Sequence, residues 1–119
     1  MLDEIIAKVQ NVGGVDLIYF LDNTYQVIKE KRNNIETNNY LEQILNIIKL
    51  ESITDELGTT FYSKVFHTYT LLNETGLVVI SKISNLGLYM IVIAGENDPV
   101  DLINLLKICK EVRLQEVRQ

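Results

Sequence analysis

Apolar residues recur at helical spacing over residues 2–12 at the start of the chain. At 100° per residue they cover about 120° of arc, which predicts an amphipathic helix with one buried face. Glycines 13 and 14 follow directly and predict the end of this helix, because glycine readily adopts the left-handed backbone common at helix C-termini. The apolar positions are Leu2, Ile5, Ile6, Val9 and Val12.

A second amphipathic pattern lies near the end of the chain. Asp98 is suited to the N-cap and Pro99 to the first helical position, and Asp101 adds negative charge to the first turn. We therefore expect a final helix that begins at this point. Its predicted buried face comprises Leu102, Leu105, Leu106, Cys109 and Val112.

Three apolar runs predict strands. Residues 15–21 are β-branched, aromatic and nearly all apolar, which is typical of a central strand covered on both faces. The turn sequence at 22–24 and the alternating pattern of 25–30 predict a hairpin partner. Residues 77–83 and 88–94, separated by another turn, predict two more strands, of which the second is central.

The middle of the chain predicts a loop, a helix and a long strand. Residues 31–39 are polar and rich in asparagine, and Asn39 with Glu42 forms a capping-box pattern for a second helix that ends near Gly58. The apolar arc of this helix is wide, about 160°, which fits either deep burial or a helix with a partner on each side. Residues 59–72 read as one extended strand with aromatic and apolar side chains on both faces.

The predicted order is helix, strand, strand, helix, three strands, helix. Short turns within each strand group indicate antiparallel meanders, so the fold class is α/β in the sense of α+β, formed by residues 1–119 as a single domain. The long strand at 59–72 would be a liability at a sheet edge, because an unpaired apolar edge invites association. Pairing with a second copy of the chain would remove that liability.

Composition narrows the class of function. The chain has a net charge of −5, which argues against nucleic acid as the main partner, since phosphate binding requires a basic patch. No apolar stretch approaches the roughly 20 residues of a membrane span, so membrane insertion is not expected. The N-terminus has two early acids in place of the basic region of a secretory signal, which predicts a cytoplasmic protein.

Catalytic and metal-binding signatures are absent from the sequence pattern. His67 is the single histidine, and Cys109 is the single cysteine and lies in an apolar helical pattern, as a buried structural thiol does. The carboxylates are distributed over turns and solvent faces, with no pair placed for acid–base catalysis. We therefore expect a protein that is not an enzyme and needs no cofactor and no metal.

Several segments together resemble the Roadblock / dynein light chain domain family. The resemblance rests on the opening helix into Gly13-Gly14-Val15, the V-D-L-I-Y-F-L strand with its Asp22-Asn23 turn, and the helix around Y-L-E-Q-I-L-N-I-I. It continues through the L-V-V-I and L-Y-M-I-V-I strands to the D-P-V-D-L helix. Asn23 stands where glycine is more typical, and asparagine tolerates the left-handed backbone expected there.

The resemblance implies a five-stranded antiparallel sheet in the order 2-1-5-4-3, with the first and last helices on one face and the second helix on the other. It also implies a homodimer joined through the third strand and second helix, and a Ras-like small GTPase as partner. By position, the candidate GTPase contacts are Glu42, Asn46 and Lys49. The candidate dimer contacts are Leu41, Ile44, Leu45, Ile48, Phe61, Tyr62, Lys64 and Phe66.

Two other functions share this architecture. A small-molecule sensor of the PAS-like or profilin-like kind would need a cavity between helix and sheet, and His67 would be its candidate haem ligand. An adaptor of the dynein-light-chain or longin kind is the other alternative, although longin domains usually begin with strands and this chain begins with a helix.

Overall fold

The computed structural model describes residues 2–33, 44–83, 87–95 and 99–118, without the side chains of 44–48 and 113–118. The chain divides into two compact units. We call Met1–Ile35 with Thr68–Gln119 the sheet unit, and Glu36–His67 the helix unit.

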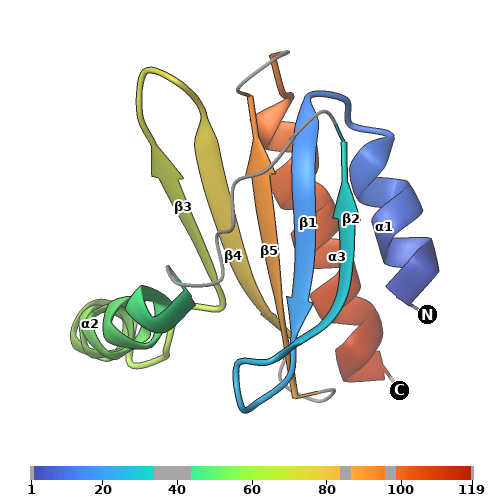
Figure 1. Ribbon diagram of the computed structural model, residues 1–119. Coiled ribbons are helices and arrows are strands. Elements are labelled where there is room, and N and C mark those ends of the chain that lie inside the picture. Colours follow the sequence, from blue (N-terminus) through green and yellow to red (C-terminus); the bar gives the residue numbers. More distant parts are fainter. Residues whose placement is uncertain (1, 34–43, 84–86, 96–98, 119) are drawn as a thin grey trace. The chain divides into compact units, whose positions relative to one another are not determined.

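The sheet unit contains a five-stranded antiparallel sheet in the order β2-β1-β5-β4-β3, as predicted (Figure 1). The predicted limits of three strands are confirmed, whereas β2 extends to Arg32, two residues into the segment expected to be a loop. The strands are β1 (Val15–Leu21), β2 (Val27–Arg32), β3 (Thr68–Leu72), β4 (Leu77–Ile83) and β5 (Leu88–Ala94).

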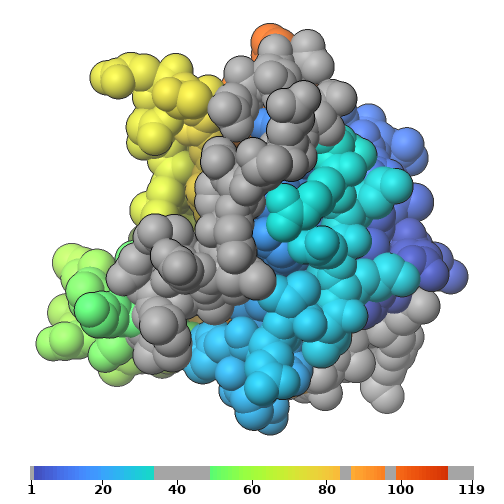
Figure 2. All heavy atoms as spheres, in the orientation of Figure 1, coloured from blue at the N-terminus to red at the C-terminus, as the bar shows by residue number. Residues whose placement is uncertain are grey.

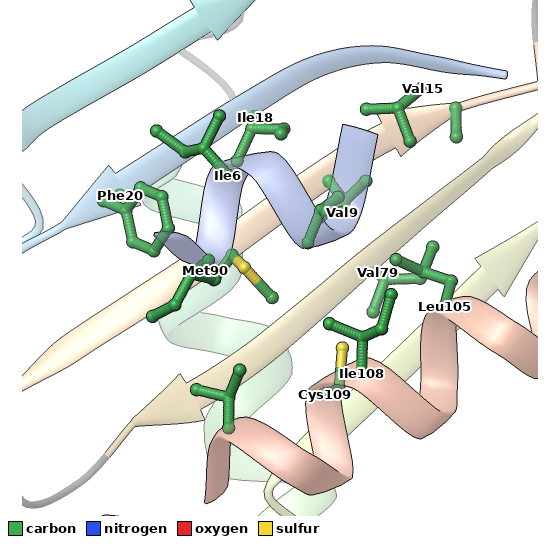
Figure 3. Close-up of a cluster of buried hydrophobic side chains, with 14 of the residues drawn as sticks. Ile6, Val9, Val15, Ile18, Phe20, Val79, Met90, Leu105, Ile108 and Cys109 are labelled. Carbon is green, nitrogen blue, oxygen red and sulfur yellow. The ribbon is translucent and has the colours of Figure 1, made fainter. Parts of the chain in front are cut away.

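Two helices, α1 (Leu2–Gln10) and α3 (Leu102–Arg118), pack on one face of this sheet and against each other. Ile6 and Val9 of α1 and Leu105 of α3 point toward the strands (Figure 3). Since side chains alternate between the two faces of a strand, every second strand residue joins this core. The strand residues in it are Val15, Ile18, Phe20, Leu77, Val79, Ile83, Met90, Val92 and Ala94.

The centre of the opposite face of the sheet is also apolar and buried. Tyr19 is paired with Ile91 on β5, and Ile91 is paired with Ile80 on β4, so the three side chains form a row across the sheet. All of them are buried, as are Leu17 and Leu21 beside them on β1. Burial on both faces explains why β1 and β5 read as continuous apolar runs in the sequence.

The turn between β1 and β2 is organised by Asp22. Its Oδ1 accepts hydrogen bonds from the Thr24 hydroxyl at 2.6 Å, the Thr24 N–H at 2.8 Å and the Gln26 N–H at 3.1 Å. These bonds hold the pKa of the Asp22 carboxyl below its ordinary value, and the bond from the Thr24 hydroxyl has the largest effect. The left-handed residue is Tyr25 with φ of 64°, and Asn23 does not have the positive φ that the family pattern suggested. The Tyr25 ring stacks on Tyr89 with centroids 5.2 Å apart.

The ends of the two outer helices follow their capping residues. Gly13 and Gly14 have φ of 80° and 73°, which confirms the predicted end of α1. The start predicted for the last helix is wrong. Asp101 caps α3, because its side chain accepts a hydrogen bond from the Asn104 N–H at 3.1 Å, and Pro99 precedes the helix. Asp98 lies outside the described residues.

The helix unit contains α2 (Ile44–Tyr62), which runs past the stop predicted at Gly58. The long strand predicted at 59–72 is therefore wrong in its first half, since β3 begins only at Thr68. Threonines favour strands, but here their hydroxyls donate to carbonyls four residues earlier, from Thr59 to Asp55 and from Thr60 to Glu56, each at 2.9 Å. Local strand propensity is thus outweighed by the helical context.

Two adjacent leucines of α3 test this packing. Leu105 is fully buried, whereas Leu106, which the sequence pattern placed on the same buried face, is 36% exposed. We expect Leu105→Ala to lower the free energy of unfolding by about 2–5 kcal/mol, because it leaves a cavity in the core. Leu106→Ala should cost less than about 1 kcal/mol. Urea unfolding followed by circular dichroism measures both values, and equal losses would contradict the assigned helix orientation.

Candidate functional site

The edge strand β3 is the first candidate surface. It pairs with β4 on one side, and the described part of the sheet has no strand on its other side. Its sequence, T-Y-T-L-L, carries no charge, and Leu71 and Leu72 are 50% and 65% exposed. By register, Leu71 shares a face with Val78 and Leu72 shares the other face with Leu77. An uncharged edge with apolar side chains on both faces is a candidate association surface, because its open N–H and C=O groups can pair with another strand.

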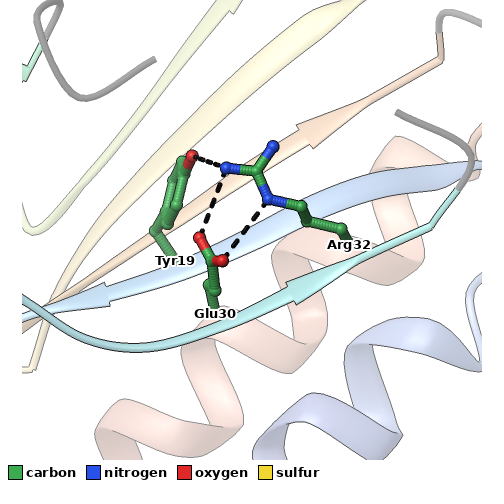
Figure 4. Close-up of polar contacts among 3 residues, drawn as sticks. All are labelled: Tyr19, Glu30 and Arg32. Atoms are coloured by element: carbon green, nitrogen blue, oxygen red, sulfur yellow. Dashed lines mark hydrogen bonds and ion pairs between the residues drawn. The ribbon is translucent and has the colours of Figure 1, made fainter. Parts of the chain in front are cut away.

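The other edge strand, β2, is built differently. The ammonium of Lys29 forms an ion pair at 2.5 Å with Asp3 of α1. Arg32 contacts Glu30 at 3.4 Å and donates a hydrogen bond to the Tyr19 hydroxyl at 3.1 Å (Figure 4). Charged side chains of this kind protect an edge strand against pairing. The two margins, β2 in cyan and the β3–β4 hairpin in yellow, lie on opposite sides of the sheet unit (Figure 2).

The C-terminal end of α2 is the second candidate surface. Phe61 and Tyr62 are each 71% exposed, and Val65, just after the helix, is 54% exposed. We call these three residues the aromatic corner. Isolated exposed apolar residues are ordinary, but three large ones within five residues of sequence make a candidate interaction surface.

The chain after Tyr62 folds back on α2, and we call residues 63–66, which include Val65, the return turn. Ser63 has a left-handed backbone with φ of 59°, and its N–H donates to the Thr59 carbonyl at 3.1 Å, as in the αL helix cap. The Lys64 N–H donates to the Gly58 carbonyl at 3.4 Å. The Phe66 ring packs edge-on against Tyr62, with centroids 5.9 Å apart.

A third candidate surface runs along α2. Lys49, Ile53 and Leu57 are four residues apart and therefore lie on one face of the helix. Lys49 is exposed, Ile53 is 59% exposed and Leu57 is 45% exposed. We call this group the outer face of α2. It joins one cation to a short apolar stripe.

The predicted contact residues fall on these surfaces in part. Phe61 and Tyr62 belong to α2, and Lys64 and Phe66 to the return turn, so their predicted position on the third strand is wrong. Leu41 and Glu42 lie outside the described residues. The backbone of Ile44, Leu45, Asn46 and Ile48 is in α2, and their side chains are outside the described set.

Sequence reasoning missed Leu71 and Leu72 as exposed residues of the edge. The sequence did contain a signal for this exposed edge, because the five residues before the turn at Asn73 carry no charge. That turn is real, because the Asn73 side chain accepts hydrogen bonds from the N–H groups of Thr75 and Gly76 at 2.8 and 3.0 Å.

The chemically reactive side chains are placed as follows. Cys109 is buried in the core of the sheet unit, and burial raises the pKa of its thiol to about 11, against a smaller opposing effect of a hydrogen bond with Ser81. His67 is half-buried just before β3. The described residues include no group of three or more His, Cys, Asp or Glu side chains that could hold a metal ion. Among the described helices, none is long and apolar enough to cross a membrane.

The fold is shared with several solved structures. An MglB structure with a tetrameric arrangement aligns with a TM-score of 0.76 at 11% identity, covering 98% of this chain and 85% of that one. The gliding protein MglB from Thermus thermophilus gives 0.75 at 12% identity, with the same coverage of 98% and 85%. A Roadblock/LC7 domain from Streptomyces avermitilis gives 0.64 at 16% identity, with 95% of each chain covered.

No protein-family model matches the chain, and no curated protein matches it by sequence. At such identities the likeness concerns the fold. The chain has a Roadblock-type fold, which confirms the resemblance inferred from its pattern of helices and strands.

Thiol reactivity tests the placement of Cys109. A thiol with a pKa near 11 in place of the ordinary 9.0 holds about a hundredfold less thiolate at pH 8, and thiolate is the reactive form. We expect Ellman's reagent to label the native protein at least about a hundredfold more slowly than the protein in 6 M guanidinium. Since the folded pKa is raised, stability from this group is complete below pH 9 and is lost between pH 9 and 11. Equal labelling rates would place Cys109 outside the core.

Proposed function

We propose that the protein is a non-catalytic, homodimeric regulator or scaffold that binds a Ras-like small GTPase in the cytoplasm. The single observation that carries this proposal is the β3 edge, which is uncharged and exposes Leu71 and Leu72. The Roadblock-type fold supports it, because the family resemblance implies both a dimer and a GTPase partner.

Pairing of two β3 strands would satisfy the open backbone hydrogen-bonding groups of this edge and bury its exposed leucines. Two copies related by a two-fold axis would align their β3 strands antiparallel, so the open N–H and C=O groups of each strand would bond to the other. Such pairing would also remove Leu71 and Leu72 from water, and burying large apolar side chains is favourable. The charged β2 edge resists the same reaction, which favours a closed dimer over a growing sheet.

The helix unit would supply the rest of the dimer contact. The aromatic corner has the composition of an interface centre, where aromatic side chains are enriched. Phe66 of the return turn packs against Tyr62 of α2, so two of the predicted contacts touch each other. The other predicted contacts on this unit, Leu41, Ile44, Leu45 and Ile48, remain part of the proposal by their position in the sequence.

The outer face of α2 is the proposed GTPase contact. Lys49 was selected from sequence together with Asn46 and Glu42, which precede Ile53 by seven and eleven residues. That spacing predicts, from the sequence, that they share a helical face with Ile53 and Leu57. The contact would thus combine polar residues at one end with the apolar pair Ile53 and Leu57 at the other.

The proposed mode of action is positioning. Residues 44–62 contain no arginine, so α2 cannot supply the inserted arginine that activates some GTPases. Any effect on nucleotide hydrolysis would come from holding the catalytic groups of the GTPase itself. MglB, a protein of the same fold, has been solved with a tetrameric arrangement, which supports the proposal of self-association.

Matched substitutions at the two edge strands test the dimer. Leu71 of β3 is 50% exposed and Ile28 of β2 is 48% exposed, so aspartate at either position places a charge on a similarly open edge. We expect wild type to have twice the 13.6 kDa chain mass by light scattering, and Leu71→Asp to be monomeric because its charge would be buried in the paired edge. Ile28→Asp should remain dimeric. A monomeric wild type at tens of micromolar, or dimers of both variants, would contradict the proposed interface.

Titration with GTPases tests the outer face of α2. The probes are the purified Ras-like GTPases of the source organism, each loaded with GDP or with a non-hydrolysable GTP analogue. We expect one of them to bind, and Ile53→Asp to weaken that binding at least about tenfold by placing a charge at an apolar contact. Ile103→Asp on α3, where the native side chain is 71% exposed, is the control and should bind as wild type does. Both variants should stay dimeric, and equal affinities would exclude this face.

A further inference from the structure

Gly58 is buried although it lies within a helix whose neighbouring residues are mostly exposed. A Cβ atom at this position would be 2.4 Å from the Lys64 carbonyl oxygen, 3.0 Å from the Phe66 nitrogen and 3.1 Å from the Val65 Cα. All three are backbone atoms, which cannot rotate aside as the end of a side chain does. The return turn therefore reaches α2 at a distance that only glycine allows.

This close approach has a cost that local structure does not offset. Glycine is less favourable than alanine inside a helix, and Ser63 has a left-handed backbone that non-glycine residues adopt at a cost. No core is gained in exchange, because residues 59–65 are all exposed and Phe66 is only half-buried. The closed return turn is thus not explained by burial of apolar surface within the helix unit.

What the close approach does fix is the geometry of the aromatic corner. Phe61 and Tyr62 are in the last helical turn, and Val65 lies in the segment whose backbone touches Gly58. The Ser63 and Lys64 hydrogen bonds and the Tyr62–Phe66 ring contact close the same segment. A contact surface that is already ordered loses less conformational entropy when it binds.

We propose that Gly58 is a positioning residue for self-association: by admitting the return turn against α2, it holds Phe61, Tyr62 and Val65 in one binding-ready arrangement. This inference rests on the proposed function, since it concerns how one of the dimer surfaces is held. Gly58 itself contacts no partner and acts through the backbone of residues 64–66.

Gly58→Ala is the direct test, with Thr60→Ala as its matched control. Both introduce alanine in the last turns of α2, but Thr60 is exposed, and its one side-chain bond among the described residues is to the Glu56 carbonyl. The measurements are the dimer dissociation constant by sedimentation equilibrium, amide hydrogen exchange of Ser63 and Lys64, and helical content by far-UV circular dichroism.

For Gly58→Ala we expect the two amides to exchange at least about tenfold faster and the dissociation constant to rise by about tenfold or more, because the surface is no longer pre-ordered. Helical content should be unchanged. Thr60→Ala should match wild type in all three measurements. A purely structural role for Gly58 would change helical content or unfolding without this selective loss of association.

The outcomes separate this inference from the proposed function. A monomeric wild type overturns the proposed dimer and the positioning role with it. A dimeric wild type whose Gly58→Ala variant associates equally well overturns the positioning role alone. If Gly58→Ala does not fold, Lys64→Pro gives a second test, because it removes the N–H that bonds the Gly58 carbonyl and adds no atom to α2. Lys64→Ala is its control, since it removes the same side chain and keeps that N–H. Unchanged association in the Lys64→Pro variant would overturn the inference.

Discussion

A sheet whose strands are apolar on both faces must be covered on both, and its two outermost strands must be paired or protected. This constraint organises the protein. On one face, α1 and α3 exclude water from the row of Phe20, Met90 and their neighbours, which supplies most of the apolar burial described for the sheet unit. Tyr19, Ile91 and Ile80 are buried on the opposite face. The two edges remain to be paired or protected.

The two edges meet that problem in different ways. On β2 the charges of Lys29 and Arg32 are held by acidic and phenolic partners, so the strand carries its own protection. β3 carries none, and ends in two exposed leucines. The asymmetry gives the sheet one margin suited to pairing, and it is the physical basis for proposing a closed dimer in place of an extended assembly.

In the described part of the helix unit, local contacts close the segment that carries the exposed aromatic side chains. Its exposed aromatic residues border a turn that is closed by backbone hydrogen bonds and by the close approach at Gly58. Large apolar side chains that are exposed yet ordered are better suited to recognition than mobile ones, since binding then orders less of the chain. The outer face of α2 differs from the aromatic corner in composition, because it combines the charged Lys49 with the aliphatic Ile53 and Leu57.

The sequence by itself determined the helix–strand order, the full extent of β1, β4 and β5, and the core-facing residues of α1. These follow from periodicity and from runs of β-branched residues, which are local signals. Sequence pattern also led to the strand order 2-1-5-4-3, through a family resemblance, and to a buried Cys109. Only the tertiary structure decided where α2 ends. In the sequence Gly58 is typical of a helix end, whereas in the structure it lies inside the helix and its lack of a Cβ atom leaves room for the backbone of the return turn. The same is true of Phe61 and Tyr62, whose preference for strands is local, whereas their helical state depends on hydrogen bonds and contacts that the surrounding chain provides.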